Sequence, residues 1–153
     1  MPQYIDSYYL IENRETSLIF NFICKYLPKY KESATDYPTP LFAEHPSRIF
    51  YNLNDIVKYL ENNPHCEYAV YLENQSENDI IKHFMIFFTD DSQMIFGISI
   101  NGKNPFNIKS VKLYHEISEF LDTSTGCITV EEAPPTNANE FIEFCKSRLN
   151  PKN

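Results

Sequence analysis

The chain has 153 residues, of which 42% are hydrophobic and 15% aromatic, enough apolar material for one domain with a real core. It carries 21 acidic and 13 basic residues, so its net charge is −8 at pH 7. This sign disfavours nucleic acid and anionic membranes as partners, because both attract a basic surface, and it suits a basic protein partner. Only three glycines occur, which argues against a glycine-rich phosphate-binding loop.

The four cysteines, at positions 24, 66, 127 and 145, form no CxxC pair and match no zinc-type spacing. Cys24 and Cys145 fall on the apolar faces of expected helices, and Cys127 opens an expected strand. The N-terminal residues show no export signal, and no run approaches the roughly 20 apolar residues of a membrane span. These observations predict a cytoplasmic protein with reduced thiols, without a cofactor and without membrane attachment.

The N-terminal part of the chain predicts a strand followed by a helix. Tyr4–Ile11 is rich in aromatic and β-branched residues, as expected of an edge strand. Asn13 is a candidate cap for the helix that follows. Apolar residues between Leu18 and Leu27 recur at helical spacing, and Pro28 is expected to end that helix.

The stretch Lys31–Pro46 is the longest that we expect to be irregular, because its three prolines oppose regular pairing. Arg48–Tyr51 is predicted to be a short strand. Asn52 or Asn54 is then expected to cap a helix that stops before Pro64. The residues of that helix expected to face inward are Ile56, Val57 and Leu60.

The centre of the chain predicts three consecutive antiparallel strands, Glu67–Glu73, Ile80–Thr89 and Gln93–Asn101. The unbroken apolar run Phe84–Phe88 indicates cover on both faces of the middle strand. Gly97 removes a side chain from one face of the third strand, which favours close packing there. The residues expected to be most buried are Phe84, Ile86, Phe88, Phe96 and Ile98.

The C-terminal part predicts a helix over Val111–Leu121, a strand over Cys127–Glu132 and a last helix that Asn137 caps. The apolar face of the last helix is expected to hold Phe141, Ile142, Cys145 and Leu149. The expected fold is therefore a single α+β domain over residues 1–153, with a central, mainly antiparallel sheet covered by about four helices.

The sequence offers no catalytic, cofactor-binding or metal-binding residues in a recognised pattern. His83 is expected to be a sheet-face histidine with one hydrogen bond, since no serine or cysteine stands near it in a nucleophile motif. The pairs Asp90–Asp91 and Glu131–Glu132 are adjacent in sequence, and neighbours on a strand point to opposite faces. A paired-carboxylate site is therefore not expected.

The Lys31–Pro46 stretch holds the residues that we predict to contact a partner. Aromatic and apolar side chains often anchor protein interfaces, and acidic residues beside them attract basic partners. The alternative is that this stretch only packs over the core. The predicted partner-binding residues are Tyr37, Leu41 and Phe42, flanked by Glu32, Asp36 and Glu44.

Three segments, YLPKYKESATDYPTP, FMIFFTDDSQMIFGISI and ITVEEAPP, resemble those of small, acidic, single-domain bacterial proteins of unassigned function. Such proteins are similar in size, charge and α+β character to immunity proteins of bacterial toxin systems. The resemblance implies an interaction protein that inhibits a basic toxin, and it implies no particular functional residue. The alternatives are a small-molecule-binding domain or enzyme with a non-local site, and a subunit of a homo-oligomer. A deep apolar pocket with converging polar groups favours the small-molecule alternative.

The cysteine spacing yields the first testable prediction. Thiol titration of the denatured protein, purified and assayed without reductant, should count four free thiols, because the spacing favours no disulfide framework. A count of two or zero would contradict both the reduced state and the cytoplasmic assignment.

Overall fold

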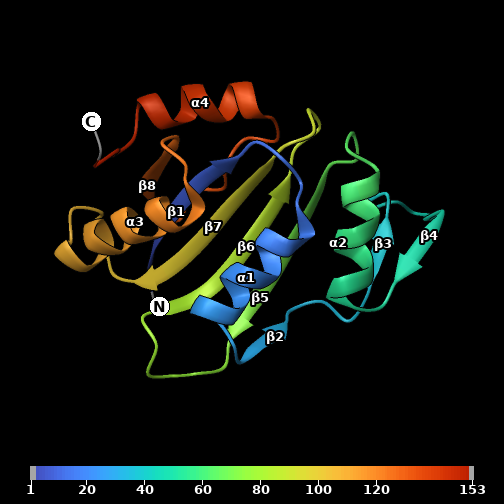
Figure 1. Ribbon diagram of the computed structural model, residues 1–153, viewed down its shortest axis with the longest axis horizontal. Coiled ribbons are helices and arrows are strands. Elements are labelled where there is room, and N and C mark those ends of the chain that lie inside the picture. Colours follow the sequence, from blue (N-terminus) through green and yellow to red (C-terminus); the bar gives the residue numbers. More distant parts are fainter. Residues whose placement is uncertain (1–2, 152–153) are drawn as a thin grey trace.

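The computed structural model describes residues 3–151 and has the expected α+β class (Figure 1). Six strands form the main sheet in the order β2-β5-β6-β7-β1-β8, and β3 and β4 form a separate pair. The elements are β1 Tyr4–Ile11, α1 Thr16–Tyr26, β2 Tyr30–Glu32, β3 Tyr37–Thr39, β4 Arg48–Phe50, α2 Leu53–Asn62, β5 Tyr68–Asn74, β6 Ile81–Phe88, β7 Met94–Asn101, α3 Ile108–Leu121, β8 Gly126–Val130 and α4 Ala138–Lys146.

The predicted three-strand meander is confirmed. β5, β6 and β7 pair antiparallel in sequence order, with Tyr68 opposite Phe88 and Phe84 opposite Ile98. All five residues expected to be buried there are at most 1% exposed.

Strand β1 is not at the edge of the sheet, contrary to the prediction for Tyr4–Ile11. It pairs antiparallel with β7 on one side and with β8 on the other. Its side chains from Ile5 to Ile11 are all buried, including Asp6 and Ser7. A sequence pattern reports burial of a strand, but the position of that strand within the sheet depends on long-range pairing.

The helices cover the two sheet faces unequally. Helices α1, α2 and α3 share one hydrophobic core with the sheet, in which Phe22 packs on Phe84 and Phe96. Figure 1 shows these helices in front of the sheet. Helix α4 packs on the opposite face, against β1, β7 and β8. Cover on both faces of β6 was expected, but Met85 and Phe87 are only half-buried on the second face.

Gly97 permits close packing, as predicted, and the group that approaches it is the Tyr8 ring of the neighbouring strand. Gly97 lies opposite Tyr8 of β1, and a Cβ atom at Gly97 would lie 2.7 Å from the Tyr8 ring. The ring therefore occupies the space that a side chain would take. The Tyr8 hydroxyl donates to the carbonyl of Glu132 at 2.5 Å, which ties β1 to the chain after β8.

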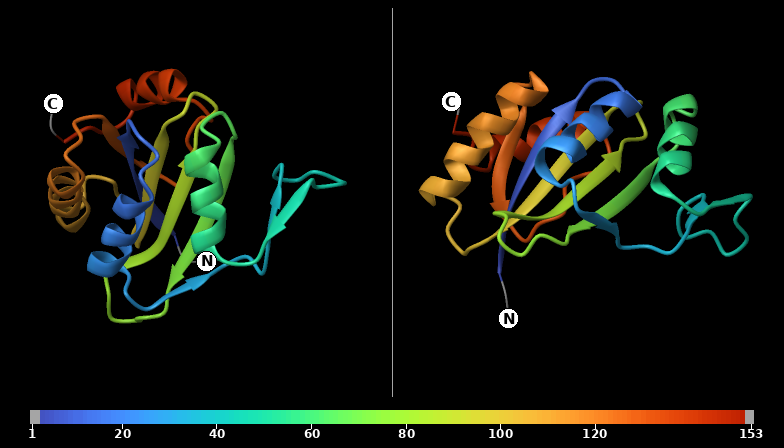
Figure 2. Two further views of the ribbon diagram at one scale, coloured as in Figure 1. Left: turned by 45° about the vertical axis from the view of Figure 1, so that its right-hand side comes forward. Right: turned by 60° about the horizontal axis from the view of Figure 1, so that its bottom comes forward.

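The stretch expected to be irregular includes the last two residues of β2 and all of β3, and this prediction was wrong in that respect. β3 pairs with β4 to form a hairpin that projects from the body of the protein, which we call the arm (Figure 2). Pro38 has no N–H, so it fits in β3 only where its backbone groups point away from β4. The Thr39 carbonyl points toward β4, because it accepts a hydrogen bond from the Ser47 N–H. Backbone groups alternate in direction along a strand, so those of the preceding residue, Pro38, point away from β4. The Pro38 carbonyl instead accepts from the Tyr68 hydroxyl at 2.9 Å.

Several element ends differ from those predicted. The N-cap of α1 is Glu15 rather than Asn13, and its side chain makes no capping bond. Cys24 is exposed, so it does not belong to the apolar face of α1. β8 ends at Val130, because Glu131 has a left-handed backbone with φ of 50°. Asn52 caps α2 and Asn137 caps α4, both through their side chains, as expected.

Arg14, in the loop between β1 and α1, is a buried cation that binds only carbonyl oxygens. Its guanidinium donates to Leu60 and Asn63, both at 2.9 Å, at the C-terminal end of α2. It also donates to Cys66 at 2.8 Å and to Thr89 at the end of β6. Burial lowers the pKa of Arg14, and the side chain is 6% exposed. The carbonyl end of a helix carries negative partial charge, which stabilises this cation.

Replacing Arg14 with lysine should therefore destabilise the fold. Lysine presents a single ammonium in place of the planar guanidinium, so it cannot reach four carbonyls in four directions. We expect Arg14→Lys to lower the free energy of unfolding by about 3 kcal/mol, measured by urea titration. Arg48→Lys, at an exposed position, is the matched control and should change it little. Equal urea midpoints for the two variants would contradict the assignment.

Candidate functional site

The residues predicted to bind a partner occupy different environments. Tyr37 is 3% exposed and its hydroxyl donates to the Glu32 carboxylate at 2.6 Å, so its ring belongs to the core rather than to the surface. Asp36 and Glu44 are exposed, and Glu32 is half-buried.

Leu41 and Phe42, the other two expected anchors, lie at the turn of the arm. Leu41 is half-buried and Phe42 is 92% exposed. Both line a cavity of about 620 Å³, which we call the apolar groove. Its other lining residues are Pro40, Cys66, Glu67, Tyr68, Ala69, Phe87, Phe88, Ala133, Pro134, Pro135 and Thr136.

Strand register brings five polar residues into one row across the second face of the sheet. Sequence analysis did not find this row, because each member comes from a different strand. The Nδ1 atom of His83 lies 2.6 Å from the Ser99 hydroxyl, which gives His83 the single hydrogen bond expected of a sheet-face histidine. In sheet order the members are Glu73, His83, Ser99, Asp6 and Thr129.

The row does not have the geometry of a catalytic serine triad. His83 contacts Ser99 through Nδ1, whereas a triad histidine contacts the serine through Nε2 and is oriented by a carboxylate at Nδ1. Ser99 is 3% exposed, so its hydroxyl is closed to a substrate. Burial lowers the pKa of His83. We therefore treat the row as part of the sheet and not as the functional site.

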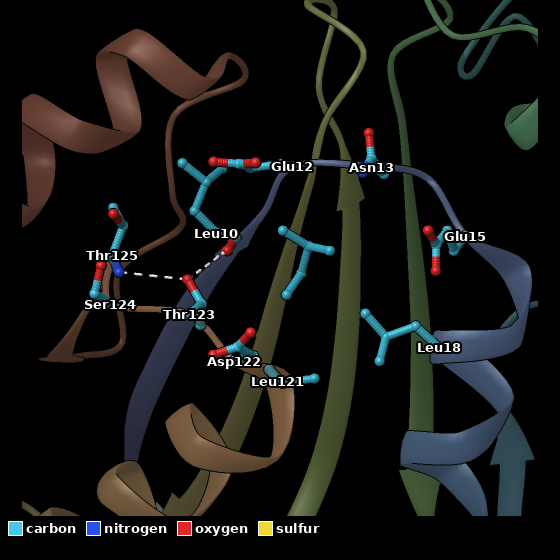
Figure 3. Close-up of a pocket in the computed structure, with 11 residues that line it drawn as sticks. Leu10, Glu12, Asn13, Glu15, Leu18, Leu121, Asp122, Thr123, Ser124 and Thr125 are labelled. Atoms are coloured by element: carbon cyan, nitrogen blue, oxygen red, sulfur yellow. Dashed lines mark hydrogen bonds between the residues drawn. The ribbon is translucent and has the colours of Figure 1, made fainter.

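A cleft of about 440 Å³ lies between the end of β1, the start of α1 and the end of α3, and we call it the acidic cleft (Figure 3). Its apolar lining comes from Leu10 and Ile11 at the end of β1, Leu18 of α1 and Leu121 of α3. The remaining lining residues are polar: Glu12, Asn13, Glu15, Asp122, Thr123, Ser124 and Thr125.

Hydrogen bonds hold the two sides of the acidic cleft in place. The Leu10 N–H donates to the Thr125 carbonyl at 2.9 Å, and the Thr123 hydroxyl donates to the Leu10 carbonyl at 2.7 Å. Asp122 caps the C-terminus of α3 in the left-handed conformation, with φ of 51°. Asparagine and aspartate adopt this conformation more readily than most residues. These contacts fix the segment between α3 and β8 against the end of β1, along one side of the cleft.

All the charged side chains that line the acidic cleft are negative. The carboxylates of Glu12, Glu15 and Asp122 are drawn around it in Figure 3, and its lining includes no lysine, arginine or histidine. Over residues 3–151, the structure gives these three carboxylates no ion-pair partner. The carbonyl end of α3 adds negative partial charge beside Asp122. The cleft can therefore hold a cation whose apolar stem lies on Leu18 and Leu121.

Sequence analysis missed the acidic cleft because its acids are scattered. Glu12 and Glu15 flank a loop near the N-terminus, and Asp122 follows a helix more than a hundred positions later. None of them stands in a motif. Only the pairing of β1 with β8 brings the two segments together.

Within the described part of the chain, no group of three or more histidine, cysteine, aspartate or glutamate residues is arranged to hold a metal ion. No helix among residues 3–151 is both long and apolar enough to cross a membrane. Comparisons with protein-family models, with curated proteins and with solved structures gave no match.

The buried carboxyl of Asp6 predicts a pH dependence of stability. Burial, and then the negative charge of Glu131, raise the pKa of Asp6 from 3.8 to about 7. The folded state thus favours the protonated form, so the contribution of Asp6 to stability is complete below pH 3.8 and is lost as the pH rises through 7. The loss should amount to about 4 kcal/mol, at 1.4 kcal/mol per pKa unit.

Asp6→Asn should flatten this dependence and raise the free energy of unfolding at pH 8, as measured by urea titration from pH 4 to pH 8. Asp90→Asn, in an exposed turn, is the matched control and should keep the wild-type profile. The assignment fails if Asp6→Asn is less stable than wild type at pH 8.

Proposed function

We propose that the chain is a cytoplasmic interaction protein of the bacterial immunity type, which binds a basic protein partner. We place the contact at the acidic cleft, where a lysine or arginine side chain of the partner enters. The observation that carries this proposal is a cleft whose three carboxylates have no ion-pair partner among residues 3–151 and whose lining has no basic residue, in a chain of net charge −8.

The dimensions of the cleft suit a long basic side chain. Binding pockets for ligands occupy about 300–1,000 Å³, and the acidic cleft, at about 440 Å³, falls within that range. Lysine and arginine bury their methylene stems on apolar surface and keep the charged head in a polar setting. Leu18 and Leu121 offer the apolar surface, and Glu12, Glu15 and Asp122 offer acceptors for the head group.

A neighbouring contact adds to the negative field. The Glu61 carboxylate of α2 accepts a hydrogen bond from the Thr16 N–H at 2.5 Å. It thereby satisfies a donor at the N-terminus of α1, next to Glu15, and offsets the positive partial charge of that helix end. A cation that approaches the cleft therefore meets negative charge from four side chains, which favours fast, salt-dependent association.

The first test uses small probes of known charge. Nα-acetyl-lysine amide and Nα-acetyl-arginine amide are titrated into the ¹⁵N-labelled full chain. Amide shifts should change at Glu12–Glu15 and Leu121–Thr125, and they should weaken as salt is added. Nα-acetyl-norleucine amide, which has a similar stem without the charge, should leave these amides unchanged. Equal shifts from all three probes would show that charge does not select the ligand.

The second test asks whether a protein partner uses the cleft. The double variant Glu12→Gln with Asp122→Asn should slow association with a basic partner by about tenfold at low salt and by less at high salt. The double variant Glu77→Gln with Asp90→Asn makes the same charge change at exposed positions outside the cleft. Surface plasmon resonance compares the two, and equal association rates would place the interface elsewhere.

A further inference from the structure

The outer edge of strand β5 is paired along only part of its length. β2 pairs with Leu72–Asn74, and the bond of Ser33 N–H to the Tyr71 carbonyl, at 3.1 Å, is the last backbone bond on that edge. Backbone groups alternate in direction along an antiparallel strand, so the N–H and C=O of Ala69 point outward as those of Tyr71 do. Among residues 3–151, no hydrogen-bond partner is found for them on this edge.

The apolar groove adjoins this unpaired edge. Glu67, Tyr68 and Ala69 of the edge belong to its lining, together with the turn of the arm and the segment that leads into α4. A cavity of about 620 Å³ has room for at least one apolar side chain of a bound segment. Free backbone groups beside an apolar cavity are the two features that strand addition requires.

Phe42 is held in a position that leaves its ring without packing. Its backbone lies in the left-handed region, with φ of 63°, and its side chain is 92% exposed. The Ala43 N–H donates to the Pro40 carbonyl at 3.2 Å and closes the turn. Bulky residues rarely adopt this conformation, and such backbone strain is concentrated at binding and catalytic sites. A segment in the groove would bury this ring.

The charge around the groove is negative. Glu67 lines it directly, and burial together with the nearby charge of Asp36 raises the pKa of Tyr68 to about 12. The lining includes no lysine or arginine. A segment with a basic residue next to its apolar anchor therefore complements the groove, and an acidic segment is repelled.

We propose that the β5 edge at Glu67–Tyr71 binds an extended segment of a partner protein by strand addition. One apolar side chain of the segment enters the apolar groove against Phe42, and a neighbouring lysine or arginine lies beside Glu67. Alternate residues of an extended strand face the same side. The expected sequence of the bound segment therefore has apolar residues two positions apart, with basic residues next to them. This site is separate from the acidic cleft, and the inference does not rest on the proposed function.

The test is a selection of displayed random ten-residue peptides on the full chain. Enriched peptides should have apolar residues two positions apart with lysine or arginine next to them. Their synthetic forms should shift the amide signals of Glu67–Tyr71 and slow hydrogen exchange at Ala69. N-methylation of the peptide backbone at alternate positions should abolish binding, since it removes the strand hydrogen bonds. An enriched set that is acidic, or that binds equally after N-methylation, would overturn the proposal, as would no enrichment.

Variants of the chain sharpen the test. Phe42→Ala should weaken peptide binding about tenfold, whereas Phe106→Ala, at a 70% exposed ring outside the groove, should not. Ala69→Pro removes the outward N–H, which edge strands tolerate, and also changes the groove lining at Ala69; it should weaken binding as well. Glu12→Gln with Asp122→Asn should leave it unchanged, which separates this site from the acidic cleft. Equal effects of Phe42→Ala and Phe106→Ala would overturn the proposal even if Ala69→Pro does not fold.

Discussion

The buried guanidinium of Arg14 is the contact on which the geometry of this end of the sheet depends. It joins three parts of the chain, namely the loop before α1, the C-terminal end of α2 and the end of β6. A buried charge without a counterion requires that nearly all its polar contacts be made. Four carbonyl oxygens accept from the two terminal nitrogens, while Nε has no hydrogen-bond partner among residues 3–151. Any displacement of one part leaves both the cation and a carbonyl less satisfied.

Arg14 also lies between the two sites described above. Its own loop carries Glu12 and Glu15 of the acidic cleft, and its bond to Cys66 holds the segment that enters the apolar groove. The two sites open at the same end of the sheet, where β1 finishes and β5 begins. Helix α4 packs against β1, β7 and β8, and Met85 and Phe87 of β6 lie at the border of that cluster, half-buried, beside the groove.

The sequence predicts the local parts of this fold well. The meander, the burial of Phe84 and Phe96, and the caps Asn52 and Asn137 follow from periodicity and from short-range hydrogen bonds, so their signal is contained in a few consecutive residues. The position of β1, the β3–β4 arm and the burial of Tyr37 depend on pairings between distant segments, which no periodicity records.

The candidate sites also divide into residues with a local sequence signal and residues whose role depends on distant parts of the chain. The loop residue Phe42 is predicted as an anchor because an aromatic residue among prolines is a local signal, and it does line a groove. Glu12 and Asp122 carry no such signal, because an acidic residue in a polar loop is what a solvated surface also requires. Arg14 is indistinguishable in the sequence from an exposed arginine between two polar neighbours. Its role exists only once α2 and β6 are in place.

The central position of β1 has a consequence for how the chain reaches its native state during synthesis. β1 precedes every other described strand, yet its two neighbours β7 and β8 begin only at Met94 and Gly126. Until β7 and β8 have been synthesised, the apolar side chains of β1, among them Tyr8 and Tyr9, have no strand to pair with and stay exposed on the nascent chain. Sheets closed by such distant pairings form slowly and leave strand edges open to other chains. With a net charge of −8, copies of this chain repel one another during this interval, and that repulsion protects the unfinished sheet from association.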